Sequence, residues 1–168
     1  TIHAPQEFYI NSGRNATFQG GKSRLTFPVS FPKNTVEWYY TFSASRDGAQ
    51  IKQTKQNLKL ASDLTKLLIG GVTGGVLSIG MNQLTQPPGS DYCDIYLLDK
   101  NNFSSFEAKV DFDQITQGTR KNFKSGVVQM KCCINETYYI GIKNPDAGYG
   151  INVVIEVAAI CVDEDWVM

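Results

Sequence analysis

Strict alternation of apolar and polar residues is the feature that most constrains how this chain folds. Between residues 35 and 44 every second residue is apolar, from Val36 to Ala44, and segment 24–31 has the same period. Because successive side chains of a β-strand point to opposite faces, each segment predicts a strand with one apolar face on a core. Turn-forming residues at 31–34 separate the segments and predict that the two strands are neighbours.

The same alternation continues along most of the chain. Further strands are predicted at 92–98, 106–112, 126–134, 138–142 and 151–161, with one more around Phe8 and Ile10. The last segment is apolar on both faces, so we expect it in the interior of its sheet. Pro28 lacks an amide hydrogen, which predicts an edge strand or a bulge. About eight strands separated by turns predict a mainly β fold, an antiparallel β-sandwich that is jelly-roll-like.

Residues 51–86 interrupt this pattern. Apolar residues recur at helical spacing from Leu60 to Leu68, and the Lys- and Gln-rich stretch before them favours helix. A Gly-rich segment follows at 67–81, and two consecutive prolines, 87 and 88, end the excursion. With 42% hydrophobic and 19% charged residues, residues 1–168 predict a single domain with a helical hairpin inserted at about 51–86. One helix followed by an irregular Gly-rich segment is the alternative.

The Gly-rich segment 67–81 is the first candidate for function. Gly70, Gly71, Gly74 and Gly75 form two overlapping Gly-x-x-x-Gly spacings, which let a second backbone approach a helix closely. Three interpretations are open: a helix packed on the sandwich, a contact between copies of the chain, or contact with a membrane. The segment is shorter than the roughly 20 apolar residues that cross a bilayer, which favours the packed helix.

Two tyrosines are the second candidate. Alternation places Trp38 and Tyr40 in the core and Tyr39 on the outer face of the same strand, and Tyr139 is expected to point outward in the same way. Rigid, amphipathic rings exposed on a sheet suit a platform for a protein or carbohydrate ligand. Isolated exposed aromatic residues are common on protein surfaces, so the alternative is that neither tyrosine binds a partner.

Cysteine and histidine are too sparse for a zinc site or a catalytic triad. The only histidine is His3, and the cysteines at 93, 132, 133 and 161 include no Cys-x-x-Cys pair. On a strand, Cys132 and Cys133 point to opposite faces, so we expect no bond between them. In an oxidising compartment, one of the two is expected to pair with Cys93 or Cys161. The favoured alternative is that the cysteines are buried free thiols.

Acidic residues and net charge add two further expectations. Carboxylates are clustered at 91–99, 111–113 and 163–165. We expect these segments to be solvated turns and strand ends, where acidic residues are common. We expect no cofactor, with bound calcium as an alternative because calcium prefers oxygen ligands. Lys+Arg and Asp+Glu both number 16, so the formal net charge is zero and a nucleic-acid partner is not expected.

Three segments carry a resemblance to known families. They are Asp94–Phe103 (DIYLLDKNNF), Glu136–Pro145 (ETYYIGIKNP) and Gly150–Val157 (GINVVIEV). Together they resemble the GOLD (Golgi dynamics) domain and the bacterial pre-peptidase C-terminal domain, over roughly residues 23–44 and 91–160. The chain departs from both through the insertion at 51–86 and through Glu136-Thr137, where those families have a glycine before the tyrosine pair. The resemblance implies an interaction or accessory module, and no functional residue transfers with it.

These observations favour a non-catalytic binding or interaction module in a secreted or cell-surface setting, with an unspecified ligand. The first residues have no signal-peptide pattern, which leaves secretion open. A membrane-associating or oligomerising protein that acts through the Gly-rich hairpin 67–81 is one alternative. A hydrolase that uses two carboxylates is another, since such pairs carry no local sequence signature.

Overall fold

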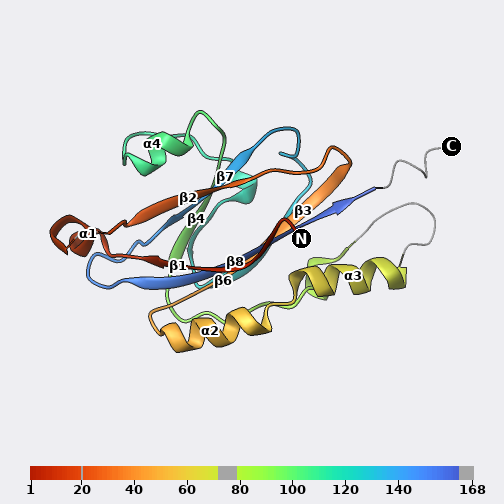
Figure 1. Cartoon of the computed structure of the whole chain (residues 1–168), viewed down its shortest axis with the longest axis horizontal. Coiled ribbons are helices and arrows are strands. Elements are labelled where there is room, and N and C mark those ends of the chain that lie inside the picture. The colour runs from red at the N-terminus through yellow and green to blue at the C-terminus, as the bar shows by residue number, and fades with distance from the viewer. Residues whose placement is uncertain (20, 72–78, 163–168) are drawn as a thin grey trace.

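The computed structural model describes residues 1–19, 21–71 and 79–162. Within these ranges the chain forms eight strands in two antiparallel sheets of four. The strands are β1 (His3–Ile10), β2 (Arg24–Val29), β3 (Thr35–Ser45), β4 (Cys93–Leu98), β5 (Arg120–Phe123), β6 (Ser125–Met130), β7 (Tyr138–Lys143) and β8 (Ile151–Cys161). One sheet has the order β1-β8-β3-β6 and the other has the order β2-β7-β4-β5 (Figure 1). The prediction of a mainly β, antiparallel fold with about eight strands is confirmed.

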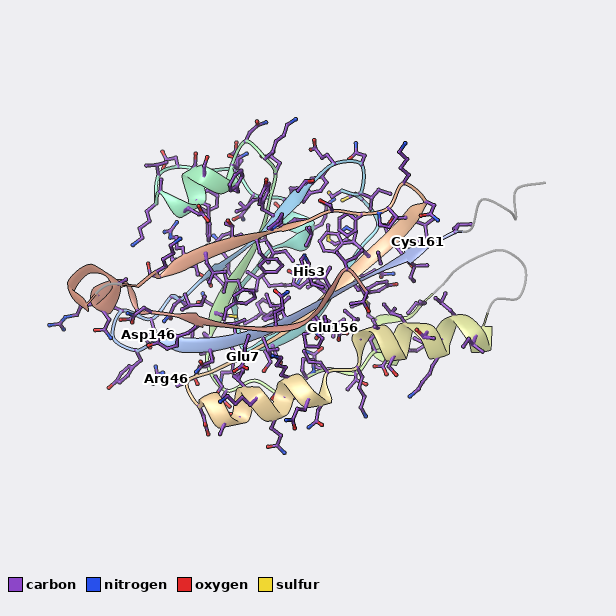
Figure 2. All side chains as sticks on the ribbon, viewed as in Figure 1. His3, Glu7, Arg46, Asp146, Glu156 and Cys161 are labelled. Carbon is purple, nitrogen blue, oxygen red and sulfur yellow. The ribbon has the colours of Figure 1, made fainter. Side chains whose placement is uncertain are left out.

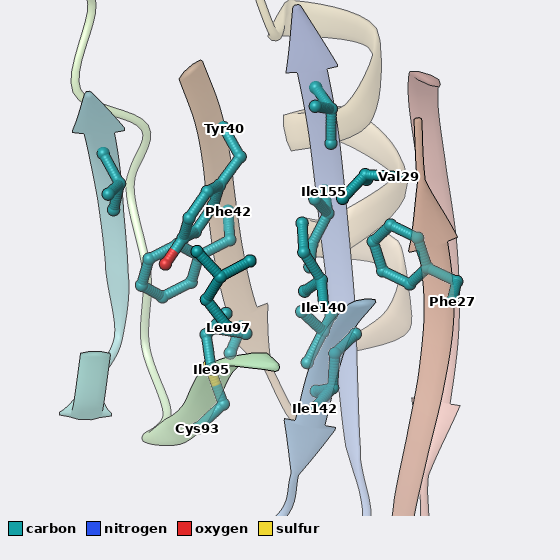
Figure 3. Close-up of a cluster of buried hydrophobic side chains, with 14 of the residues drawn as sticks. Phe27, Val29, Tyr40, Phe42, Cys93, Ile95, Leu97, Ile140, Ile142 and Ile155 are labelled. Atoms are coloured by element: carbon teal, nitrogen blue, oxygen red, sulfur yellow. The ribbon is translucent and has the colours of Figure 1, made fainter. Parts of the chain in front are cut away.

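The two sheets share one core. Trp38, Tyr40 and Phe42 of β3 are fully buried, as their alternation predicts. Tyr40 and Phe42 face the side chains of the other sheet, including Ile95 of β4 and Ile140 of β7 (Figure 3), and Trp38 belongs to the same hydrophobic cluster. Burying each of these large side chains stabilises the fold by about 2 to 3 kcal/mol. One apolar face of β3 and one of β8 therefore lie between the two sheets.

Strand positions within the sheets match two predictions and correct a third. β2, which contains Pro28, is an edge strand, and β8 lies in the interior of its sheet. The prediction that segments 24–31 and 35–44 are neighbouring strands is wrong, because β2 pairs with β7 whereas β3 pairs with β6 and β8. The connection carries the chain from one sheet to the other, and its Phe31 packs against Trp38 at 4.8 Å between ring centroids.

Segment 106–112 is not a strand. It begins inside the short helix α4 (Phe103–Glu107) and continues through turns, where Lys109 has a left-handed backbone (φ 60°). Phe106 and Phe112 both pack against Tyr96 of β4, at 5.2 and 5.4 Å between ring centroids. The apolar residues therefore converge on one aromatic cluster instead of lining a strand. The eighth strand is β5, whose mostly exposed residues have no apolar alternation to predict it.

The insertion begins with two consecutive helices. α2 (Gly48–Asn57) starts at Asp47, whose side chain accepts hydrogen bonds from the backbone amides of Ala49 and Gln50. α3 (Leu60–Gly71) follows after two residues that belong to neither helix, and both helices lie on the outer face of the β1-β8-β3-β6 sheet (Figure 1). The remaining helical elements are α1 (Gly13–Gln19) and two single 3-10 turns, η1 (Met81–Gln83) and η2 (Thr116–Gly118). The prediction of helix in this region is confirmed at α2 and α3.

The Gly-rich candidate lies only partly within the structure. Gly70 and Gly71 are the last two residues of α3, whereas Gly74 and Gly75 lie outside the described residues. The predicted second arm of the helical hairpin falls mostly on the same undescribed residues. Of the helices in the described ranges, none combines the length and the apolar composition that crossing a membrane requires.

Candidate ligand cleft

The outer face of the β1-β8-β3-β6 sheet is covered by α3 where β3 and β8 run beneath it. Tyr39 of β3 is fully buried there, in a cluster with Leu60, Leu64, Leu84, Ala158 and Ile160. The prediction that Tyr39 points to solvent is therefore wrong, because the apolar stripe of α3 needs a second apolar surface and finds it on this face. The Nε2 group of Gln129 donates a hydrogen bond to the Tyr39 hydroxyl (3.0 Å). Burial, aided by the nearby Glu37 carboxylate, raises the pKa of Tyr39.

Glu156 of β8 fixes the first turn of α3 to the sheet. Its Oε1 accepts a hydrogen bond from the backbone amide of Leu60 (2.9 Å), and its Oε2 accepts one from Ala61 (3.3 Å). The first amides of a helix have no acceptor within the helix, and a carboxylate at this end also interacts favourably with the helix dipole. Only 5% of Glu156 is exposed. Figure 2 places this residue at the junction of α2 and α3.

A cleft of about 490 Å³ opens beside this junction. It lies between the end of α2, the start of α3, the β3 strand and the segment 85–88. The residues that line it are Thr41, Gln50, Gln53, Thr54, Asn57, Leu58, Lys59, Leu60, Thr85, Gln86, Pro87 and Pro88. The volume is within the range of about 300 to 1,000 Å³ that is usual for small-molecule sites. With the exception of Thr41, all of these residues come from the region of the insertion or its immediate borders.

The cleft combines a larger apolar surface with polar groups that are almost uncharged. Side-chain amides and hydroxyls contribute most of the polar groups, and Lys59 is the charged residue among those that line it. The Oε1 atom of Gln50 accepts hydrogen bonds from the hydroxyls of Ser45 (2.8 Å) and Ser90 (2.9 Å), which hold one wall in place. Amides and hydroxyls both donate and accept hydrogen bonds, so the cleft can recognise an uncharged polar ligand.

A second surface is formed by loops at one end of the two sheets. Arg46 contacts Asp146 (2.5 Å) and Asp91 (3.5 Å), and its guanidinium group lies over the ring of Tyr149, 4.4 Å from the centroid. Figure 2 shows Arg46 and Asp146 together near the start of α2. Tyr149 and Tyr9 are both more than 60% exposed. These exposed tyrosines were missed, because single tyrosines beside turns have no distinguishing pattern.

The interactions of the Asp146 carboxylate are expected to make the stability of the fold decrease in acid. Hydrogen bonds from the backbone amides of Gly148 and Tyr149, together with Arg46, lower the pKa of Asp146. A group with a lowered folded-state pKa contributes stability above its unfolded pKa, about 3.9 for aspartate, and loses it as the pH falls through the folded value. We expect urea denaturation to show that wild type loses more stability between pH 6 and pH 3 than Asp146→Asn does. Equal losses would contradict this contribution.

The other predicted residues do not converge on one site. Tyr139 of β7 is half-buried and stacks on Phe103 of α4, with 3.9 Å between centroids and 11° between planes. It belongs to the sheet opposite that of Tyr39, so the two tyrosines do not form one platform. The Asp94 carboxylate accepts a hydrogen bond from the backbone amide of Asn122. Among the side chains that the structure describes, no group of three or more His, Cys, Asp or Glu residues is placed to hold a metal ion.

Comparison with known proteins gives no relative from which a function transfers. No family model, no curated protein and no solved structure matches the chain. The resemblance to GOLD and pre-peptidase C-terminal domains therefore stays a prediction, and the cleft is interpreted from its own residues.

Proposed function

We propose that the chain is a non-catalytic binding module, built as a β-sandwich of the jelly-roll type, whose cleft between α2 and α3 takes a small uncharged polar ligand. The observation that carries this proposal is the lining of the cleft by amide and hydroxyl side chains around about 490 Å³ of space. A ligand rich in hydroxyl or amide groups, such as a sugar or a capped amino acid, matches these donors and acceptors. A secreted or cell-surface setting is part of the same proposal.

The position of the cleft supports this assignment. Its walls come from α2, α3 and the segment 85–88, and hydrogen bonds hold them in place. Glu156 holds the start of α3, and the Ser43 hydroxyl donates to the backbone carbonyl of Pro88 on the other side. Preorganised walls reduce the entropy that a ligand must overcome on binding. Thr54, which lines the cleft, is itself buried.

Filling the cleft is expected to weaken binding without unfolding the chain. Asn57 is exposed at the end of α2 and lines the cleft, so Asn57→Trp places a large ring in the ligand space. The probes are neutral mono- and disaccharides and N-acetylated amino-acid amides, titrated into ¹⁵N-labelled protein. For any probe that binds, we expect amide shifts confined to residues 50–60 and 85–88, and affinity at least about tenfold lower in the variant, a loss of about 1.4 kcal/mol.

Gln56→Trp is the matched control, because Gln56 is exposed on the same helix and is not among the lining residues. We expect this variant to bind as wild type does, and both variants to unfold within about 0.5 kcal/mol of wild type, as surface substitutions usually do. Binding that survives in Asn57→Trp, or amide shifts that map to another face, would place the ligand elsewhere and overturn the proposal.

A further inference from the structure

Cys132 and Cys133 bring their two sulfur atoms together in a turn after β6. The Sγ atoms are 2.7 Å apart, and Cys133 has a left-handed backbone (φ 65°). This conformation is uncommon for any residue other than glycine, and it turns the second side chain back towards the first. The prediction that the two cysteines point to opposite faces is wrong, because β6 ends at Met130 and the pair lies outside the strand.

Core contacts hold this turn in place. The indole Nε1 of Trp38 donates a hydrogen bond to the backbone carbonyl of Cys132 (3.1 Å). Both cysteines and the following Ile134 pack against the main hydrophobic core as partly buried residues. The hydroxyl of Tyr138 also donates to Oδ1 of Asn135 (3.1 Å), which closes the connection to β7. The proximity of the sulfurs is therefore a property of the fold.

The pair is accessible from one side. Both residues are half-buried, and Cys132 lines a hollow of about 330 Å³ together with Gln117, Gln129, Met130 and Lys131. Burial raises the pKa of Cys133 to about 12, with added contributions from the hydrogen bond to Cys132 and from its charge. Cys133 is therefore protonated at neutral pH. A reagent that enters the hollow meets Cys132 first.

We propose that Cys132 and Cys133 form a dithiol site that a low-molecular-weight disulfide of the glutathione type oxidises reversibly. The Cys132 thiolate attacks one sulfur of the reagent, whose S–S bond breaks and releases one thiolate, which takes up a proton. Cys133 then loses its proton and attacks the Cys132 sulfur of the mixed disulfide, which releases the second reagent thiol. Two protein thiols are oxidised by two electrons, and one reagent disulfide is reduced to two thiols.

The geometry makes the Cys132–Cys133 disulfide easy to reduce. Adjacent Cα atoms are about 3.8 Å apart across a trans peptide, below the usual range of about 4.4 to 6.8 Å for disulfides. A strained ring of this kind is more readily reduced than an ordinary structural disulfide. The site therefore suits a response to the surrounding thiol–disulfide balance better than it suits permanent cross-linking.

Mass spectrometry of the full chain tests this proposal. The background is Cys161→Ser, because Cys161 is exposed and competes for the reagent, whereas Cys93 is buried. After incubation with oxidised glutathione, alkylation and tryptic digestion, we expect peptide 132–143 to have lost two hydrogen atoms and to carry neither glutathione nor alkyl groups. Dithiothreitol should restore both thiols. In Cys133→Ser the reaction should stop at a glutathione adduct on Cys132.

A comparison of the folded and the denatured chain shows whether the fold builds the site. In glutathione buffers we expect the folded chain to form the Cys132–Cys133 bond with an equilibrium constant at least about tenfold larger than the chain in guanidinium, because the turn already holds both sulfurs together. Wild-type peptide that is alkylated on both cysteines, or that carries glutathione on both, would overturn the proposal. Equal equilibrium constants in the two states would do so as well.

Discussion

Replacing Tyr39 by alanine is expected to lower the free energy of unfolding by about 3 to 4 kcal/mol, the range of a large aromatic residue removed from a core. The side chain is fully buried between β3 and α3, where it packs with Leu60, Leu64 and Ala158. The substitution removes these contacts and leaves a cavity beneath α3. It also removes the hydroxyl that accepts a hydrogen bond from Gln129. Urea denaturation at neutral pH, followed by circular dichroism, measures the loss.

Two variants separate burial from the loss of the hydroxyl. Tyr39→Phe keeps the ring and is expected to cost about 1 kcal/mol, the usual contribution of one hydrogen bond. Tyr9→Ala is the matched control, because Tyr9 is 62% exposed, and its effect should stay within about 0.5 kcal/mol. Combining Tyr39→Ala with Leu64→Ala should give a coupling energy above about 0.5 kcal/mol. If Tyr39→Ala were as mild as Tyr9→Ala, α3 would not pack on this face.

The alternation of apolar and polar residues predicted the strands that have one apolar and one polar face. It failed where strand pairing or packing between distant segments determines the structure. Trp38 and Tyr40 are in the core because every second side chain of β3 points there. Alternation says nothing of which strand pairs with which, so the separation of β2 and β3 into different sheets was missed. Phe106 and Phe112 also fit a strand in spacing, but their rings gather around Tyr96 from a short helix and a turn.

The outer face and the cleft depend on segments that are far apart in the sequence. The apolar stripe of α3 indicated that this helix packs against another apolar surface. Ala158 and Ile160, on the second face of β8, indicated where that surface lies. Connecting those two observations predicts that Tyr39 is covered. The cleft has no such signal, because its amides and hydroxyls resemble those of any polar surface. Cys132 and Cys133 were misplaced because the end of β6, and the left-handed φ beyond it, leave no trace in the alternation.

Glu156 holds the start of α3 on the sheet, and replacing it by alanine is expected to lower the free energy of unfolding by about 3 kcal/mol. The substitution leaves the amides of Leu60 and Ala61 without their acceptor in a buried position, and a hydrogen bond to a charged group contributes about 1.5 to 3 kcal/mol. The loss should be greatest in α3 itself. Hydrogen exchange is therefore expected to accelerate more in residues 60–71 than in β4, which lies in the opposite sheet.

Two controls distinguish this anchoring role from the general loss of a carboxylate. Glu156→Gln keeps one acceptor oxygen and should cost about half as much as Glu156→Ala, with a smaller acceleration of exchange in α3. Glu7→Ala removes a more exposed carboxylate that contacts Lys55 of α2 at 4.0 Å, and such a pair contributes less than about 1 kcal/mol. Because Leu60 also lines the cleft, Glu156→Ala should weaken ligand binding, whereas Glu7→Ala should not. If Glu156→Ala and Glu7→Ala had the same effect on exchange in α3, the two hydrogen bonds from Glu156 would not be what holds this helix on the sheet.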